Sequence, residues 1–196
     1  MNTFLLRVAL CCGLLLASLA NNVGVANAAS CASATADQIN CRVDQQMIQN
    51  GGGDGFGSVV RLRQTFKPSS AKGLCRVDLL IQKNSANAGS LTLQIMGVGL
   101  TPPLTRTIPA PAIPLNIATW VTFNFSSCPT GSQLQAATSY QLELSAGSSP
   151  MNAYTWINSQ GAGGNAAYAD GSGWRNAGAG WVQQNYDYAF KVYLCY

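Results

Sequence analysis

The segment Leu74-Cys-Arg-Val-Asp-Leu-Leu-Ile-Gln-Lys83 alternates between apolar and polar side chains. Its two sides are Cys75, Val77, Leu79 and Ile81 against Arg76, Asp78 and Gln82. A period of two with one apolar side is typical of a β-strand that packs on one face and meets water on the other. We therefore predict a strand here.

The same alternation recurs along the chain. In the segment from Val60 to Lys67, Val60, Leu62 and Phe66 oppose Arg61, Arg63 and Lys67. Similar patterns occupy residues 91–96, 121–125, 140–144 and 188–194. Turns rich in Gly, Pro and Ser separate these segments, as in sandwich proteins. The pattern predicts an all-β protein, an antiparallel two-sheet β-sandwich of the jelly-roll kind.

The segment before these strands has two interpretations. Ile39, Val43 and Met47 stand four residues apart, and Thr35–Gln38 has the form of a capping box. This favours a short N-terminal helix at residues 36–49 as much as an extended lead-in strand.

The domain boundaries follow from these patterns. Residues 50–57 contain five glycines and are predicted to form a mobile loop. We expect a lead-in and Gly-rich loop over residues 29–57 and the sandwich over residues 58–196. Alternatively, residues 43–57 contribute a first strand to the sandwich.

The N-terminus has the features of a secretory signal peptide. Arg7 precedes the apolar run Val8–Ala20, and the small-residue site Ala26-Asn-Ala28 follows. We expect cleavage after Ala28, with Ala20 as a second candidate and a lipoprotein box at Ala28–Cys31 as a third interpretation. The run is too short to span a bilayer, so we expect a secreted protein without a membrane span.

Five cysteines follow the predicted cleavage site: Cys31, Cys41, Cys75, Cys128 and Cys195. Disulfides are expected in an oxidising compartment, and an odd number leaves at least one cysteine over. Cys31 and Cys41 are a candidate pair because they are close in sequence, and one further pair would join two of the other three.

The charge balance is mild. The sequence has 11 Lys and Arg, 7 Asp and Glu and no His. This is too little positive charge to indicate a nucleic-acid partner. The absence of His removes Ser-His-Asp catalysis and His-ligated metals.

The order of the strand patterns resembles a known family. The segments that carry the resemblance run from Val43-Asp-Gln-Gln through Gln64-Thr-Phe-Lys-Pro-Ser, Leu74–Lys83, Leu91-Thr-Leu-Gln-Ile, Trp120-Val-Thr-Phe-Asn-Phe, Leu134–Leu144 and Tyr154-Thr-Trp to Asp187-Tyr-Ala-Phe-Lys-Val-Tyr. Over residues 43–194 the chain resembles the jelly-roll modules of bacterial secreted and cell-surface proteins, which are similar in build to carbohydrate-binding modules. The resemblance implies a non-catalytic extracellular β-sandwich, and it implies a structural role for Asp187.

Few residues suit catalysis or metal binding. A glycoside hydrolase needs two carboxylates that flank a cleft, and the candidates are Asp78 and Glu143 on the wet faces of strands together with Asp170 and Asp187. Asp170 with nearby carbonyls would also suit a structural calcium site, although carboxylate ligands are few. We expect no other cofactor and no enzymatic activity.

The C-terminal aromatic residues divide into two groups. Tyr154, Trp156, Tyr188 and Phe190 alternate along strands, so we expect them in the core. Trp174 and Trp181 stand in segments rich in Gly, Ala and Asn, which we expect to be loops. An exposed Trp beside amide side chains suits a sugar ring.

We therefore expect a ligand site on the C-terminal aromatic segment, formed by Trp174, Trp181, Asp170, Asn176 and Gln183. Its partner would be an extracellular polysaccharide or cell-surface polymer. The outward residues Arg61, Arg63 and Lys67 favour a charged edge strand, or alternatively a surface for an anionic polysaccharide. A structural or adhesive protein without a glycan site is the other main interpretation.

Overall fold

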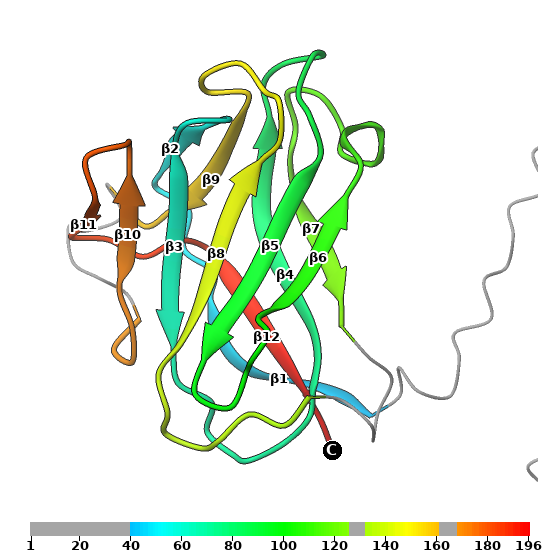
Figure 1. Cartoon of the computed structure of the whole chain (residues 1–196), viewed down its shortest axis with the longest axis vertical. Coiled ribbons are helices and arrows are strands. Elements are labelled where there is room, and N and C mark those ends of the chain that lie inside the picture. The colour runs from blue at the N-terminus through cyan, green and yellow to red at the C-terminus, as the bar shows by residue number, and fades with distance from the viewer. Residues whose placement is uncertain (1–39, 126–131, 161–167) are drawn as a thin grey trace, which may run out of the picture. The chain divides into compact units, whose positions relative to one another are not determined.

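A computed structural model describes residues 40–125, 132–160 and 168–196. These residues form two antiparallel sheets that pack against each other as a β-sandwich (Figure 1). The predicted all-β fold is confirmed. Within the described residues the helical structure is one 3-10 turn, Ala110–Ala112.

We call one sheet the front sheet, because it faces the viewer in Figure 1. Its strands in spatial order are β11 (Trp181–Gln183), β10 (Gly173–Asn176), β3 (Arg61–Phe66), β8 (Tyr140–Ala146), β5 (Leu91–Gly97) and β6 (Leu104–Ile108). Strand β3 is therefore an internal strand. The prediction that Arg61, Arg63 and Lys67 mark an edge strand is wrong, because the β10–β11 hairpin adds to the sheet beyond β3.

The back sheet is organised around β4 (Leu74–Lys83). Its other strands are β1 (Cys41–Met47), β12 (Phe190–Cys195), β9 (Tyr154–Asn158), β2 (Gly52–Phe56) and β7 (Ala118–Asn124). One side of β4 pairs with β12 and then β9, and its other side pairs with β7. Strand β4, which the alternation of residues 74–83 predicts, thus pairs with more strands than any other described strand of this sheet.

The core lies between the sheets and follows the predicted alternation. The apolar sides of the front strands are buried, with Leu62, Leu93 and Leu144 fully inaccessible to solvent. The four aromatic residues assigned to the core are also fully buried: Tyr154, Trp156, Tyr188 and Phe190. That prediction is confirmed.

The N-terminal predictions need correction. Residues 41–47 form β1, which pairs with β12, so the helix interpretation is wrong over these residues. Pairing with β12 holds these residues extended, and a bulge between Val43 and Gln45 leaves Val43 exposed while Met47 is buried. Residues 36–39 and the predicted signal peptide lie outside the described residues.

The Gly-rich segment is also not a loop, because residues 52–56 form β2 beside β9. Its glycines serve close packing. A Cβ at Gly53 would overlap the Thr155 side chain, and a Cβ at Gly55 would overlap that of Asn152. The sandwich therefore includes β1 and β2.

The disulfide differs from the candidate pair. Cys41 bonds to Cys75, with the two Cα atoms 6.0 Å apart. A bulge in the pairing of β4 with β12 moves Cys75 off the main core into a small cluster with Tyr193 and Cys195. Cys195 also takes part in a disulfide. Cys31 and Cys128 lie outside the described residues.

The first prediction concerns this bond. We expect peptide mapping without reduction to join the Cys41 peptide to the Cys75 peptide. The bond closes a sequence separation of 34 residues, so Cys41→Ser should lower the free energy of unfolding by about 4 kcal/mol. A Cys31–Cys41 cross-link in the folded protein would contradict the structure.

Candidate functional site

The two candidate tryptophans lie on a β-hairpin rather than in loops. Trp174 is on β10 and Trp181 is on β11, and the strands pair antiparallel. The connection between them contains Gly178 and Gly180 at φ values of 101° and 106°, a conformation that glycine adopts readily. The loop prediction is wrong because strands of three and four residues are too short to show alternation.

The pairing register places four of the five candidate residues on one face. Trp174 lies opposite Gln183, and Asn176 lies opposite Trp181. Directly paired residues share a face of the sheet, as do residues two apart on one strand. The side chains of Trp174, Asn176, Trp181 and Gln183 therefore belong to the outer face of the front sheet.

The same face continues onto β3 and β8. Trp174 pairs with Arg63 and Asn176 with Arg61, while Arg63 pairs with Glu143 across the next strand boundary. We call the set Trp174, Trp181, Arg61, Arg63 and Glu143 the aromatic–arginine face. It combines residues that are far apart in the sequence, and its members come from four adjacent strands.

Arg63 is the centre of this face. Its guanidinium lies over the Trp181 ring, 3.8 Å from the ring centroid. A cation over an indole face is worth about 0.5–2 kcal/mol, depending on how well water is excluded. The stack also holds the planar guanidinium in one orientation, which leaves less side-chain entropy to lose when a ligand binds.

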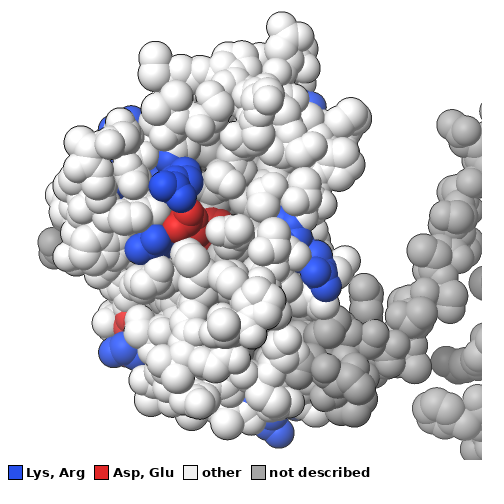
Figure 2. Space-filling model, in the orientation of Figure 1, with Lys and Arg blue, Asp and Glu red and all other residues white. Residues whose placement is uncertain are grey.

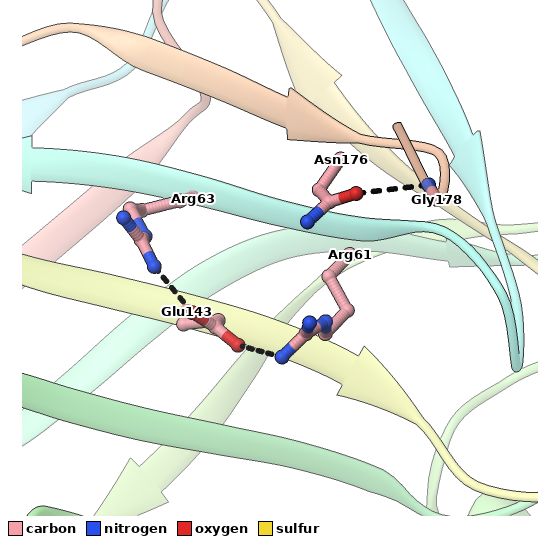
Figure 3. Close-up of polar contacts among 5 residues, drawn as sticks. All are labelled: Arg61, Arg63, Glu143, Asn176 and Gly178. Carbon is pink, nitrogen blue, oxygen red and sulfur yellow. Dashed lines mark hydrogen bonds and ion pairs between the residues drawn. The ribbon is translucent and has the colours of Figure 1, made fainter. Parts of the chain in front are cut away.

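Glu143 joins the two arginines. Its carboxylate accepts a hydrogen bond of 3.0 Å from Arg61 Nη1 and one of 2.7 Å from Arg63 Nη2 (Figure 3). Only 7% of the Glu143 side chain is exposed, against 51% for Arg61. The expectation of a solvated Glu143 is therefore wrong, because the two guanidinium groups cover the carboxylate.

Uncharged residues, most of them polar, surround this cluster. Figure 2 shows acidic atoms held between basic side chains on the face of the front sheet, with uncharged surface beside them. By register, the outward residues of β8, β5 and β6 are Gln141, Ser145, Thr92, Gln94, Met96, Thr105 and Thr107. Hydroxyl and amide groups therefore extend the face away from the tryptophans.

The side-chain amides of Asn176 and Gln183 make different hydrogen bonds. Asn176 Oδ1 accepts a hydrogen bond of 2.8 Å from the Gly178 backbone N–H and so stabilises the hairpin turn (Figure 3). Among the described residues, no hydrogen bond uses the Asn176 side-chain NH₂ group. Gln183 Nε2 donates to Ser172 Oγ at 3.0 Å, which leaves the Gln183 carbonyl oxygen as an acceptor.

Asp170 does not belong to the aromatic–arginine face. It is exposed in a turn three residues before β10. Over the described residues, no group of three or more His, Cys, Asp or Glu side chains is arranged to hold a metal ion. A calcium site formed by Asp170 with nearby carbonyls stays a prediction.

A network at Asp54 holds the chain that leads from β11 to β12. Asp54 Oδ2 accepts hydrogen bonds of 2.5 Å from both the Tyr186 and the Tyr188 hydroxyl groups. Tyr188 also stacks on Trp156, with the ring centroids 4.6 Å apart. Sequence patterns did not single out Asp54, because a lone carboxylate among glycines gives no local signal.

These contacts change the acidity of the tyrosines. Burial raises the pKa of both Tyr186 and Tyr188, and the negative charge of Asp54 raises each pKa further. Burial also raises the pKa of Tyr168 to about 12. All three phenols therefore stay protonated, and remain hydrogen-bond donors, to a higher pH than an exposed tyrosine.

A second network anchors the start of the hairpin. Asp187 is fully buried, and its Oδ1 accepts a hydrogen bond of 2.9 Å from Gln64 Nε2. Its Oδ2 accepts one of 3.1 Å from the Tyr168 backbone N–H. Gln64 Oε1 in turn accepts a hydrogen bond of 2.8 Å from the Tyr188 backbone N–H. Both ends of the segment that carries β10 and β11 are thereby fixed to β3.

Comparisons with known proteins give no further identification: no family model matches the chain, and no curated protein matches it. Within the described residues, no helix has the length and apolar character needed to cross a membrane.

The second prediction concerns Asp187. Replacement by Ala leaves one N–H of Gln64 Nε2 and the Tyr168 backbone N–H buried without an acceptor, so Asp187→Ala should lower the free energy of unfolding by roughly 2–5 kcal/mol. Urea denaturation measures the effect. Asp170→Ala is the control and should change stability by less than about 0.5 kcal/mol, because Asp170 is exposed in a turn. Equal effects of the two variants would contradict the network.

The third prediction concerns alkaline pH. In the unfolded chain Tyr168, Tyr186 and Tyr188 ionise near the ordinary pKa of 10.0, whereas the fold holds all three pKa values higher. The unfolded state therefore loses protons first, and stability falls as the pH rises above 10.0. Tyrosinate absorbance from these residues should appear only with the loss of the β-sheet circular dichroism signal. Ionisation of every tyrosine in a protein that stays folded would contradict this.

Proposed function

We propose that the chain is a secreted, non-catalytic protein that binds a carbohydrate or another extracellular surface polymer on its aromatic–arginine face. The observation that carries the proposal is the placement of Trp174 and Trp181 on adjacent paired strands of one outer sheet face. Both rings are only partly buried, so they present apolar area to solvent from a backbone held by hydrogen bonds.

A sugar polymer suits this surface for physical reasons. The apolar side of a sugar ring stacks on an aromatic ring, and its hydroxyl groups need donors and acceptors at the rim. Here the Asn176 NH₂ group and the Gln183 oxygen lie beside the rings by register. The hydroxyl and amide residues of β5, β6 and β8 prolong the polar surface, as an extended polymer requires.

Secretion is supported by the disulfide and by the N-terminal sequence. A Cys41–Cys75 bond persists in oxidising compartments, which include the cell exterior. The order of charge, apolar run and small-residue site in residues 1–28 is that of a signal peptide.

A non-catalytic role is supported by the state of the carboxylates. The sequence contains no His to act as a general base. Asp187 is fully buried and bound to Gln64. Asp78 is 5% exposed and lies 3.4 Å from Arg76 Nη2, so it is committed to an ion pair. Glu143 is held by two arginines in the same manner.

The fourth prediction tests the tryptophans. Trp181→Ala and Trp174→Ala should each weaken polysaccharide binding by about 2 kcal/mol, or roughly 30-fold in Kd, because a truncated aromatic anchor commonly costs this much. Pull-down with insoluble polysaccharides and a glycan array, followed by titration calorimetry on the best ligand, would measure the effect.

Trp120→Ala is the matched control, because Trp120 lies on β7 of the back sheet. It should leave binding unchanged in protein that circular dichroism shows to be folded. Glycan binding that survives both front-sheet substitutions would overturn the site. Self-association without binding to any polymer would favour the structural or adhesive interpretation instead.

A further inference from the structure

We propose that the aromatic–arginine face selects a carboxylated polysaccharide, one whose sugar rings carry uronate groups. This inference rests on the proposed function and names the class of ligand. The guanidinium groups of Arg61 and Arg63 would bind the sugar carboxylates while the tryptophans hold the rings. Glu143 is the protein's own carboxylate, and it pairs with the same two guanidinium groups that the ligand would bind.

Protection of a sheet edge does not explain the two arginines. Charges on an outer strand often protect a sheet edge from pairing with another chain. Strand β3, however, is hydrogen-bonded to β10 on one side and to β8 on the other. Arg61 and Arg63 therefore lie on an internal strand, where edge protection is not needed, and are available for a role in recognition.

The face carries an excess of positive charge. Arg61, Arg63 and Glu143 are its charged residues on β3 and β8, and β5, β10 and β11 add no outward charge. Arg106 on β6 instead donates to the backbone oxygens of Asn124 and Phe125. One carboxylate thus balances only one of two guanidinium groups, which favours a ligand with negative charge.

The arginines also retain unused donors. A guanidinium has five N–H groups, and Arg61 and Arg63 each give one hydrogen bond to Glu143. Arg63 Nε is buried and has no partner. Because that atom is closed to solvent, the donors open to a sugar carboxylate are the other N–H groups, chiefly those of Arg61, whose side chain is 51% exposed.

Trp181 makes the site specific for a ring that bears a carboxylate. Because the Arg63 guanidinium lies 3.8 Å from the Trp181 centroid, the cation and the aromatic ring form one unit. A uronate residue presents an apolar ring face and a carboxylate on the same sugar. A neutral sugar would use the ring alone, and a simple anion would use the cation alone.

The test compares a charged and a neutral form of one polysaccharide. Polygalacturonate and its fully methyl-esterified form have the same sugar backbone, but the ester lacks the negative charge. We expect at least about tenfold tighter binding to polygalacturonate, with the difference shrinking as salt is raised because exposed charges are screened. Alginate serves as a second carboxylated probe, dextran sulfate as a sulfated one and xylan as a neutral one.

Variants of the arginines and of Glu143 make the test specific. Arg63→Gln should lower affinity for polygalacturonate about tenfold or more, since it removes a partly buried charge partner. Arg61→Gln should act in the same direction and is safe for folding, because that side chain is 51% exposed. Glu143→Gln should raise the affinity severalfold, since it removes the competing carboxylate.

Arg42→Gln is the control, because it removes one positive charge just as Arg63→Gln does. Arg42 lies on β1 of the back sheet and should change binding by less than twofold. If Arg42→Gln and Arg63→Gln weaken binding equally, net charge alone acts and the inference fails.

The outcomes separate the two proposals. Equal binding of the acid and the ester, or binding to xylan alone, would overturn the charge selection and leave the proposed function standing. Preference for dextran sulfate over both carboxylated polymers would replace uronate by sulfate and overturn the inference. Binding to none of the probes would count against both proposals.

Discussion

The buried contact between Gln64 and Asp187 is the constraint on which the arrangement of this protein depends. It joins β3 of the front sheet to the chain just before β12 of the back sheet, and both side chains are fully inaccessible to water. A hydrogen bond to a charged group contributes about 1.5–3 kcal/mol, whereas a buried carboxylate without its partners would cost more. The same carboxylate also binds the Tyr168 backbone, so the segment carrying β10 and β11 leaves and re-enters the fold at one anchored point.

Strand β3 connects stability with the proposed binding. Its inward residues, Leu62, Gln64 and Phe66, complete the core and hold Asp187. Its outward residues, Arg61 and Arg63, hold Glu143 and the Trp181 ring. Because alternation assigns these tasks to opposite faces, a substitution on the outer face can change recognition with little effect on the core. The short hairpin strands would be marginal alone, and β3 provides the pairing that makes them part of a sheet.

Alternation was sufficient to predict the sandwich and most of its core, because a strand buried on one side leaves a period of two in its own sequence. It could not predict β2, where glycines serve close packing with β9, or the hairpin strands, which are too short for a pattern. The candidate residues Trp174 and Trp181 were identified from composition, but their link to Arg63 was not. Glu143 and Arg63 are 80 positions apart, and their contact depends on the register of two strands that no local pattern specifies.

The partial neutralisation by Glu143 explains how such a face could be selective rather than merely attractive to anions. Two uncompensated arginines would repel each other and bind any polyanion, since long-range attraction carries little geometric information. With Glu143 between them, the guanidinium groups are oriented and one of the two positive charges is balanced. A ligand must then offer a carboxylate at the remaining donors and a ring at Trp181 together, which disfavours incorrect partners.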